Sequence, residues 1–131
     1  MSGLVLIVDD QEVVRTAIRR VLDFCDDFQV CGDAENGEQA IEKVVELKPD
    51  IILMDINMSV MDGITAAAQI RRLSPAAKIV FLTVHDGEVF RNGTQPWADG
   101  FVPKDSVGRE LISTLHRVAS TRPSNSGKSR R

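Results

Sequence analysis

Four short apolar segments of this chain each run directly into a polar residue. The segments are residues 4–8, 51–54, 79–82 and 101–103, and the polar residues at their ends are Asp9 with Asp10, Asp55, Thr83 and Lys104. Each segment is too short for a helix but suits a strand that is buried on both faces of a parallel sheet. Because open parallel sheets bind ligands outside the carboxyl ends of their strands, we expect these polar side chains to share one pocket.

The segments between and after these strands show the apolar spacing of helices. Apolar residues recur at spacings of three and four within residues 13–22, 40–47, 64–70 and 107–119, and Phe28–Ala34 is interpreted as a further strand. Right-handed crossovers then place helices on both faces of a five-stranded parallel sheet, so we predict a doubly wound α/β fold. Val13 and Val45 are counted among the buried apolar residues, and Asp105 or Ser106 is expected to cap the last helix.

Two segments depart from this regular pattern. A fourth crossover helix is expected over residues 86–99, but Gly87, Asn92–Gly93 and Pro96 make it short or distorted. Residues 121–131 are mostly Ser, Pro, Lys and Arg, which offer little to bury, so we expect a flexible tail or the start of a linker. The folded domain is therefore predicted to occupy residues 1–120.

Composition narrows the class of protein. With 43% hydrophobic and 27% charged residues and a formal net charge of -3, the chain is typical of globular domains and gives no argument for nucleic-acid binding. The first apolar run breaks at Asp9 and has no basic residues before it, so we expect neither a signal peptide nor a membrane span, and a cytoplasmic location. Cys25 and Cys31 match no zinc or redox spacing and are interpreted as reduced core residues.

Five motifs in order resemble the receiver domain of two-component response regulators, of the chemotaxis-regulator type or joined to a LuxR-type output domain. They are Asp9–Asp10, Asp55 within Leu53–Met58, Asp62–Gly63, Thr83, and Lys104 after Gly100–Pro103. The resemblance implies a flavodoxin-like strand order 2-1-3-4-5. It also implies that Asp55 accepts a phosphoryl group from a sensor histidine kinase and that Lys104 pairs with Asp55 in the resting state.

The same resemblance implies a Mg²⁺ site and a switch. Asp10, Asp55 and the backbone carbonyl of Asn57 would bind Mg²⁺ directly, with Asp9 acting through water, and Thr83 with Phe101 would form the switch pair. Elementary electrostatics agrees, since two carboxylates about 5 Å apart repel by about 3 kcal/mol at an effective dielectric constant near 20, which a divalent cation relieves. A competing interpretation is that one of Asp9 and Asp10 caps the first helix.

Signalling, rather than turnover of a substrate, is the function that the resemblance implies. The domain would catalyse only its own phosphorylation and dephosphorylation, and would pass the signal to a downstream protein, a fused output domain or a second copy of itself. Gln11, Arg15 and Arg19 on the exposed face of the first helix would help to select the kinase. A pseudo-receiver that binds partners without phosphorylation stays open, mainly because Val84 could narrow access to Asp55. A phosphohydrolase resembling the haloacid dehalogenases would need Asp where Asn57 stands.

Overall fold

The computed structural model describes residues 3–84 and 97–120. In chain order the elements are β1 (Gly3–Val8), α1 (Glu12–Asp23), β2 (Phe28–Ala34), α2 (Gly37–Leu47), β3 (Ile51–Asp55), α3 (Gly63–Leu73), β4 (Lys78–Thr83), β5 (Gly100–Pro103), a 3₁₀ turn (Lys104–Ser106) and α5 (Val107–Ala119). The irregular helix predicted over residues 86–99 rests mainly on residues outside this description, as does the tail predicted over residues 121–131.

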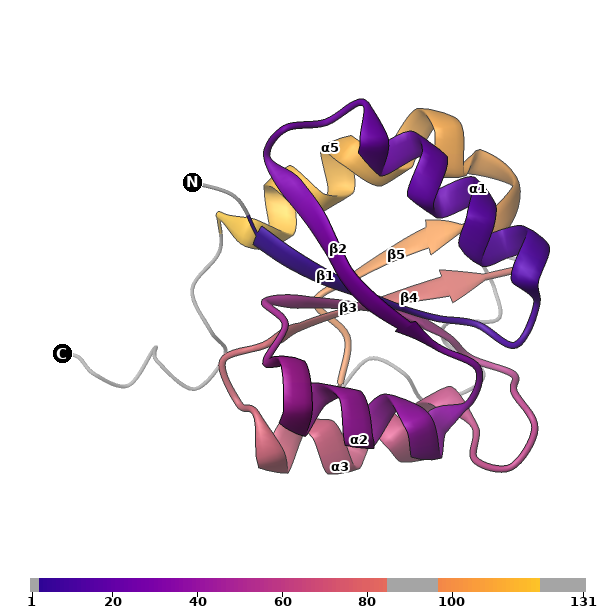
Figure 1. Cartoon of the computed structure of the whole chain (residues 1–131), viewed down its shortest axis with the longest axis vertical. Coiled ribbons are helices and arrows are strands. Elements are labelled where there is room, and N and C mark those ends of the chain that lie inside the picture. The colour runs from indigo at the N-terminus through magenta and orange to yellow at the C-terminus, as the bar shows by residue number, and fades with distance from the viewer. Residues whose placement is uncertain (1–2, 85–96, 121–131) are drawn as a thin grey trace, which may run out of the picture.

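All strand pairs are parallel, and the sheet has the order β2-β1-β3-β4-β5. Helices α1 and α5 cover one face and α2 and α3 cover the other, as Figure 1 shows. Both the predicted doubly wound fold and the predicted strand order are confirmed.

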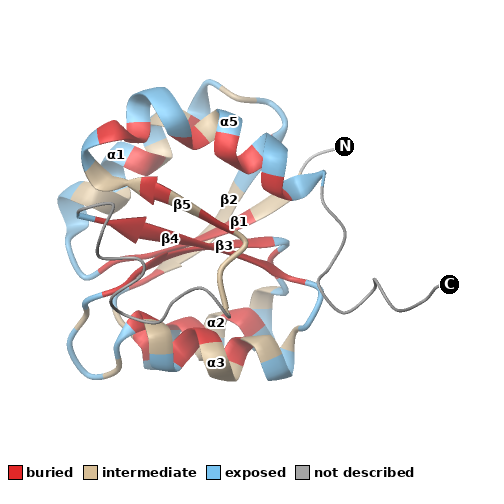
Figure 2. Ribbon diagram, turned by 180° about the vertical axis from the view of Figure 1, so that it is seen from behind, coloured by how far each residue is buried: buried red, intermediate tan, exposed pale blue. Residues whose placement is uncertain are grey.

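Alternation along the strands divides the core into two clusters. Val5 and Ile7 of β1 face α1 and α5, whereas Leu6 and Val8 face α2 and α3. Strands β3 and β4 are buried along their whole length, as the red ribbons in Figure 2 indicate. Each fully buried Leu, Ile or Val contributes about 1.5–3 kcal/mol to folding, so the central strands form a stable platform for the loops at their ends.

Side-chain caps start two of the helices. The Asn36 side chain accepts a hydrogen bond from the backbone of Gln39 at 2.9 Å, and Asp62 does the same for Thr65 at 2.7 Å. These caps satisfy backbone N–H groups that have no partner inside the helix. They fix where α2 and α3 begin, close to the carboxyl edge of the sheet.

Three expectations about side-chain placement were wrong. Ser106 precedes α5 but caps none of its backbone N–H groups, because residues Lys104–Ser106 form a 3₁₀ turn that leads directly into the helix. Val13 and Val45 are exposed rather than buried, since the contact faces of α1 and α2 are narrower than the apolar periodicity indicates.

No helix in residues 3–84 and 97–120 is long and apolar enough to span a membrane.

Candidate functional site

Strand register brings Asp9 and Asp55 to the same place. Strands β1 and β3 pair directly and end at the same level, and the two aspartates are the next residues along these strands after Val8 and Met54. Side chains alternate along a strand, so Asp9 projects to the same face as Ile7 and Asp55 to the same face as Leu53. Both of those residues belong to the cluster beneath α1 and α5. The two carboxylates therefore face each other across neighbouring strands.

Asp10 completes a group of three carboxylates. Carboxylate oxygens of Asp9, Asp10 and Asp55 all lie within 4.8 Å of one another. Asp9 and Asp55 are buried, with 0% and 3% of their surfaces exposed, whereas Asp10 is open to solvent. The sequence predicts a pocket that these carboxylates share with Thr83 and Lys104, and the three carboxylates do lie together.

The helix-capping interpretation of Asp9 and Asp10 describes only a small part of this geometry. Asp9 Oδ1 accepts a hydrogen bond from the backbone of Gln11 at 2.9 Å, which shapes the turn before α1. Gln11 itself occupies the cap position, and its side chain caps no backbone N–H group. The second oxygen of Asp9 therefore lies free of any capping role and points toward the pocket's cation.

That cation is Lys104, which follows β5. Its Nζ lies 3.1 Å from Asp9 Oδ2 and 3.1 Å from Asp55 Oδ1, and its side chain is only 19% exposed. The predicted pairing with Asp55 is present, and a second ion pair with Asp9 accompanies it. The contact with Asp9 Oδ2 falls short of hydrogen-bond geometry, so this buried oxygen is left without a hydrogen bond among the described residues.

The electrostatics of the pocket shows a shortage of positive charge. Burial, followed by repulsion from Asp9, raises the pKa of Asp55 to about 6, although Lys104 and a hydrogen bond from the backbone of Asn57 oppose the rise. Burial alone would lower the pKa of Lys104, but its contact with Asp9 and its attraction to Asp55 outweigh burial and raise that pKa above its ordinary value. One ammonium thus balances three carboxylates incompletely.

Such a donor set fits a small, hard divalent cation. Its ligands are all oxygens, one of them an orphaned carboxylate oxygen of Asp9, and the exposed Asp10 leaves one side open to water. Mg²⁺ is bound in proteins through one or two carboxylates together with waters and phosphate oxygens, which matches this arrangement. The oxygen donors of these residues and the open side at Asp10 therefore fit Mg²⁺.

Thr83 lies at the carboxyl edge of the sheet, where β4 ends beside the end of β3 that carries Asp55, and Phe101 lies on the neighbouring strand β5. Thr83 ends β4 with 1% of its surface exposed, and it shares the face of Phe81, two residues earlier. Phe101 pairs with Phe81 in the β4–β5 register, and their rings stack with centroids 6.3 Å apart. Phe101 is half-buried against the α2 and α3 side of the core, within reach of the end of β4.

The loop after β3 brings helix α3 against the backbone of Asp55. The Gly63 N–H donates to the carbonyl of Ile56 at 2.9 Å, and a Cβ at Gly63 would overlap the carbonyl oxygen of Asp55. Asn57, in the same loop, is exposed. Only glycine allows this close approach, which explains why Asp62–Gly63 stands at this point of the chain.

Arg15 lies closer to the site than its position in α1 predicts. The helical pattern predicts an exposed side chain, but the Arg15 side chain is only 13% exposed. Its guanidinium donates to the carbonyl of Asp9 at 2.7 Å and lies 3.5 Å from Asp33. Arg15 therefore holds the turn that carries Asp9 and Asp10, and of the three residues proposed to select a kinase, Gln11 and Arg19 are the more accessible.

Comparisons with known proteins find relatives over most of this chain. A family model described as the response regulator receiver domain matches residues 5–116. The chain is 40% identical over 128 residues to protein-glutamate methylesterase/protein-glutamine glutaminase 1 of Methanosarcina mazei, covering 91% of this chain and 36% of that protein. It is 35% identical over 117 residues to nitrate/nitrite response regulator protein NarL of Escherichia coli, covering 88% of this chain and 54% of that protein.

The fold is also shared with a solved structure. A two-component response regulator of the LuxR family from Aurantimonas superimposes with a TM-score of 0.85 at 29% identity, covering 94% of this chain and 89% of that one. The chain spans about half the length, or less, of the curated relatives named above.

Proposed function

Because this chain belongs to the response regulator receiver domain family, we propose that it accepts a phosphoryl group on Asp55 and relays a signal through the change that follows. The observation that carries the proposal is the Lys104 ammonium, 3.1 Å from both Asp9 and Asp55 within a group of three carboxylates. A structural ion pair would need one carboxylate for one ammonium. An excess of buried acid around a single cation is typical of a site that binds a metal and a phosphoryl group.

Asp55 is the proposed nucleophile. Its carboxylate lies at the end of a fully buried strand, where the backbone is held in place by the sheet and by helix α3. Attack of a carboxylate oxygen on phosphorus forms an acyl phosphate and releases the donor's leaving group, so transfer and hydrolysis become separate steps. Lys104 is placed to move from the Asp55 carboxylate to an oxygen of the new phosphoryl group, because an ammonium on a flexible stem acts as a mobile point charge.

Mg²⁺ is the proposed cofactor. Asp10, Asp55 and the backbone carbonyl of Asn57 would hold it directly, and Asp9 would bind it through water. When bound, the metal would offset the negative charge that collects on the phosphoryl oxygens. The task of the chain is to keep the three carboxylates close together, which β1, β3 and the Arg15 contact with the Asp9 carbonyl accomplish.

Thr83 and Phe101 are the proposed switch. Phosphorylation adds a charge of about -1.5 to -2 and three strong acceptors at Asp55, to which the Thr83 hydroxyl can donate. Movement of Thr83 would change the space beside Phe81, against which the ring of Phe101 now stacks. A turn of Phe101 would then alter the surface at β5 and α5, where a partner can detect the phosphorylated state.

The proposed partners are a sensor histidine kinase as donor and a downstream protein, a fused output domain or a second copy of the domain as receiver of the signal. The relatives support the fused arrangement, since the chain matches about half or less of their length. We assign the receiver to residues 1–120 and a tail or linker to residues 121–131. Neither nucleic acid nor membrane is a proposed partner of this domain, and the proposed location is the cytoplasm.

Phosphorylation can be tested by intact mass. The protein is incubated with acetyl phosphate and Mg²⁺, in parallel with Asp55→Asn, with a sample containing EDTA, and with Asp26→Asn as a matched control. Asp26 is exposed and lies in the loop before β2. The expected result is a gain of one phosphoryl group in the wild type and in Asp26→Asn only. Equal gain in Asp55→Asn would refute the assignment, and no gain in any sample would favour the pseudo-receiver alternative.

A further inference from the structure

A second group of metal-binding side chains lies at the opposite edge of the sheet from the three carboxylates. Cys25 and Asp27 belong to the loop between α1 and β2, and His116 lies near the end of α5. The loop leads into the amino end of β2, whereas the acidic pocket stands at the carboxyl ends of the strands. The two groups are therefore separated by the length of the sheet.

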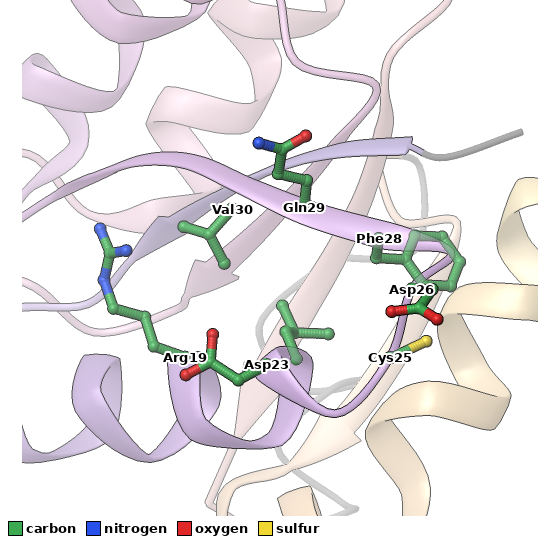
Figure 3. Close-up of a pocket in the computed structure, with 8 residues that line it drawn as sticks. Arg19, Asp23, Cys25, Asp26, Phe28, Gln29 and Val30 are labelled. Atoms are coloured by element: carbon green, nitrogen blue, oxygen red, sulfur yellow. The ribbon is translucent and has the colours of Figure 1, made fainter.

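The donor atoms of this group are close together. The sulfur of Cys25, a carboxylate oxygen of Asp27 and a ring nitrogen of His116 all lie within 4.8 Å of one another. His116 Nε2 is 2.8 Å from Asp27 Oδ2, and the ring of Phe28 packs against the imidazole with centroids 5.1 Å apart. Figure 3 shows the Cys25 sulfur directed toward the neighbouring helix, α5. These contacts already orient the imidazole and the carboxylate toward the thiol.

The backbone holds both loop residues in place. The Cys25 N–H donates to the carbonyl of Leu22 at 3.0 Å, and the Asp27 carbonyl accepts from Gly3 at 2.8 Å. Cys25 also packs against the core cluster beneath α1 and α5. A donor set on anchored backbone loses little conformational entropy when it binds an ion, which favours a site over a chance encounter of surface groups.

We infer that Cys25, Asp27 and His116 bind a thiophilic divalent transition ion, with Zn²⁺ as the natural candidate. Thiolate, imidazole and carboxylate together are a typical zinc donor set, whereas Mg²⁺ and Ca²⁺ select oxygen alone. Ligand atoms of one tetrahedral zinc lie roughly 3.3–3.8 Å apart, so the site closes by side-chain shifts of about 1 Å. Three protein ligands leave the fourth position to water.

Access and charge both suit a cation. A hollow of about 350 Å³ borders the site, and Cys25, Phe28, Asp23 and Asp26 are among the residues that line it. The carboxylates of Asp23 and Asp26 add negative potential at its entrance. Arg19 also lines the hollow, but its guanidinium lies 3.4 Å from Asp33 and is directed away from Cys25 in Figure 3.

Binding has a defined proton balance. The Cys25 thiol loses its proton to solvent as the sulfur–metal bond forms, and the imidazole binds the ion through a ring nitrogen that carries no proton. The His116–Asp27 hydrogen bond is then replaced by two metal bonds, which requires the two atoms to separate by about half an ångström. The ion would fasten α5 to the loop after α1, two elements far apart in the chain.

Co²⁺ and Zn²⁺ are the probes for this site. The untagged full chain, reduced and in excess Mg²⁺ to occupy the acidic pocket, is titrated with Co²⁺ and followed by absorption. A thiolate-to-cobalt charge-transfer band with the visible bands of a tetrahedral ion is expected at one Co²⁺ per chain. Zn²⁺ should abolish these bands and raise the melting temperature, because it binds the native state. No charge-transfer band in the wild type would overturn the inference.

Matched variants identify the ligands. Cys25→Ala and His116→Gln should each weaken Zn²⁺ binding by about tenfold or more and remove the tetrahedral cobalt spectrum. Cys31→Ala is the control, since Cys31 lies in β2 outside the group and should leave both readouts unchanged. His116 is exposed, so its variant folds even if Cys25→Ala does not. Unchanged affinity in His116→Gln, or loss of the band in Cys31→Ala alone, would contradict the assignment.

Discussion

Replacing Gly63 with alanine probes the close packing of α3 on the backbone of Asp55. An added Cβ would overlap the Asp55 carbonyl oxygen and lie 3.0 Å from both the Asp55 carbonyl carbon and Met54 Cγ. Carbon–oxygen contacts relax at about 3.3 Å, so the first turn of α3 would have to move by about 1 Å. The obstacle is backbone at the end of a buried strand, which cannot rotate away as a side chain could.

The size of the effect follows from three contributions. Overpacking costs about 1–3 kcal/mol. Strain on the hydrogen bond from Gly63 to Ile56, now 2.9 Å long, adds about 1 kcal/mol. The smaller conformational entropy of alanine in the unfolded chain offsets about 0.5–1 kcal/mol. The free energy of unfolding should therefore fall by about 2 kcal/mol, which lowers the melting temperature by about 8 °C in a domain of this size.

Gly108→Ala is the matched control for this substitution. Gly108 lies within α5, and a Cβ there would meet no heavy atom within 4 Å. The same chemical change should therefore raise the free energy of unfolding by about 0.5–1 kcal/mol, because alanine favours the helix. Urea unfolding of the three proteins in EDTA measures both values. If Gly63→Ala were as stable as the wild type, the packing of α3 on Asp55 would be refuted.

Three further predictions concern charge. Lys104→Met leaves two buried carboxylates without their cation, so the free energy of unfolding should fall by about 2 kcal/mol. The same variant should bind Mg²⁺ more tightly than the wild type in calorimetry, because the metal no longer competes with the ammonium. Equal Mg²⁺ affinity in the two proteins would contradict this prediction. In EDTA, the folded-state pKa of Asp55 at about 6 exceeds its ordinary value of 3.8, so protonation favours folding. The stability advantage of Asp55→Asn over the wild type should therefore grow as pH rises from about 4 to about 7, and a pH-independent difference would exclude the raised pKa. Arg71 donates hydrogen bonds to three carbonyls and to the Asp99 carboxylate. Arg71→Lys should therefore lower the free energy of unfolding, measured in urea, by about 2 kcal/mol. The exposed Arg72→Lys is the control and should lower it by about 0.5 kcal/mol or less.

Much of the site could be predicted because the strands themselves carry it. A run of buried residues that ends on Asp55 marks both a strand and the edge where its side chain emerges, and parallel strands bring such ends together. The second partner of Lys104 could not be predicted in this way. Whether its ammonium reaches Asp9 as well as Asp55 depends on the register of β1, β3 and β5, which local patterns do not specify.

The remaining misjudgements share a physical cause. Periodicity identifies an apolar stripe but not how much of it a neighbouring element covers, so Val13 and Val45 were assigned to the core and lie exposed. The group of Cys25, Asp27 and His116 likewise depends on tertiary contacts that no local pattern specifies. Asp27 and His116, which are hydrogen-bonded to each other, are 89 residues apart in the sequence. No spacing rule for metal sites covers such a separation. A search for His and Asp beside each cysteine in three dimensions finds it.

The most direct test of the account is to locate the phosphoryl group. The protein is phosphorylated with acetyl phosphate and Mg²⁺ and reduced with borohydride, which converts an aspartyl phosphate to homoserine, and its peptides are then mapped by tandem mass spectrometry. The account predicts homoserine at position 55 alone. Homoserine at Asp9 or Asp10, or a phosphoryl group on a residue other than aspartate, would contradict the assignment of Asp55 as the acceptor.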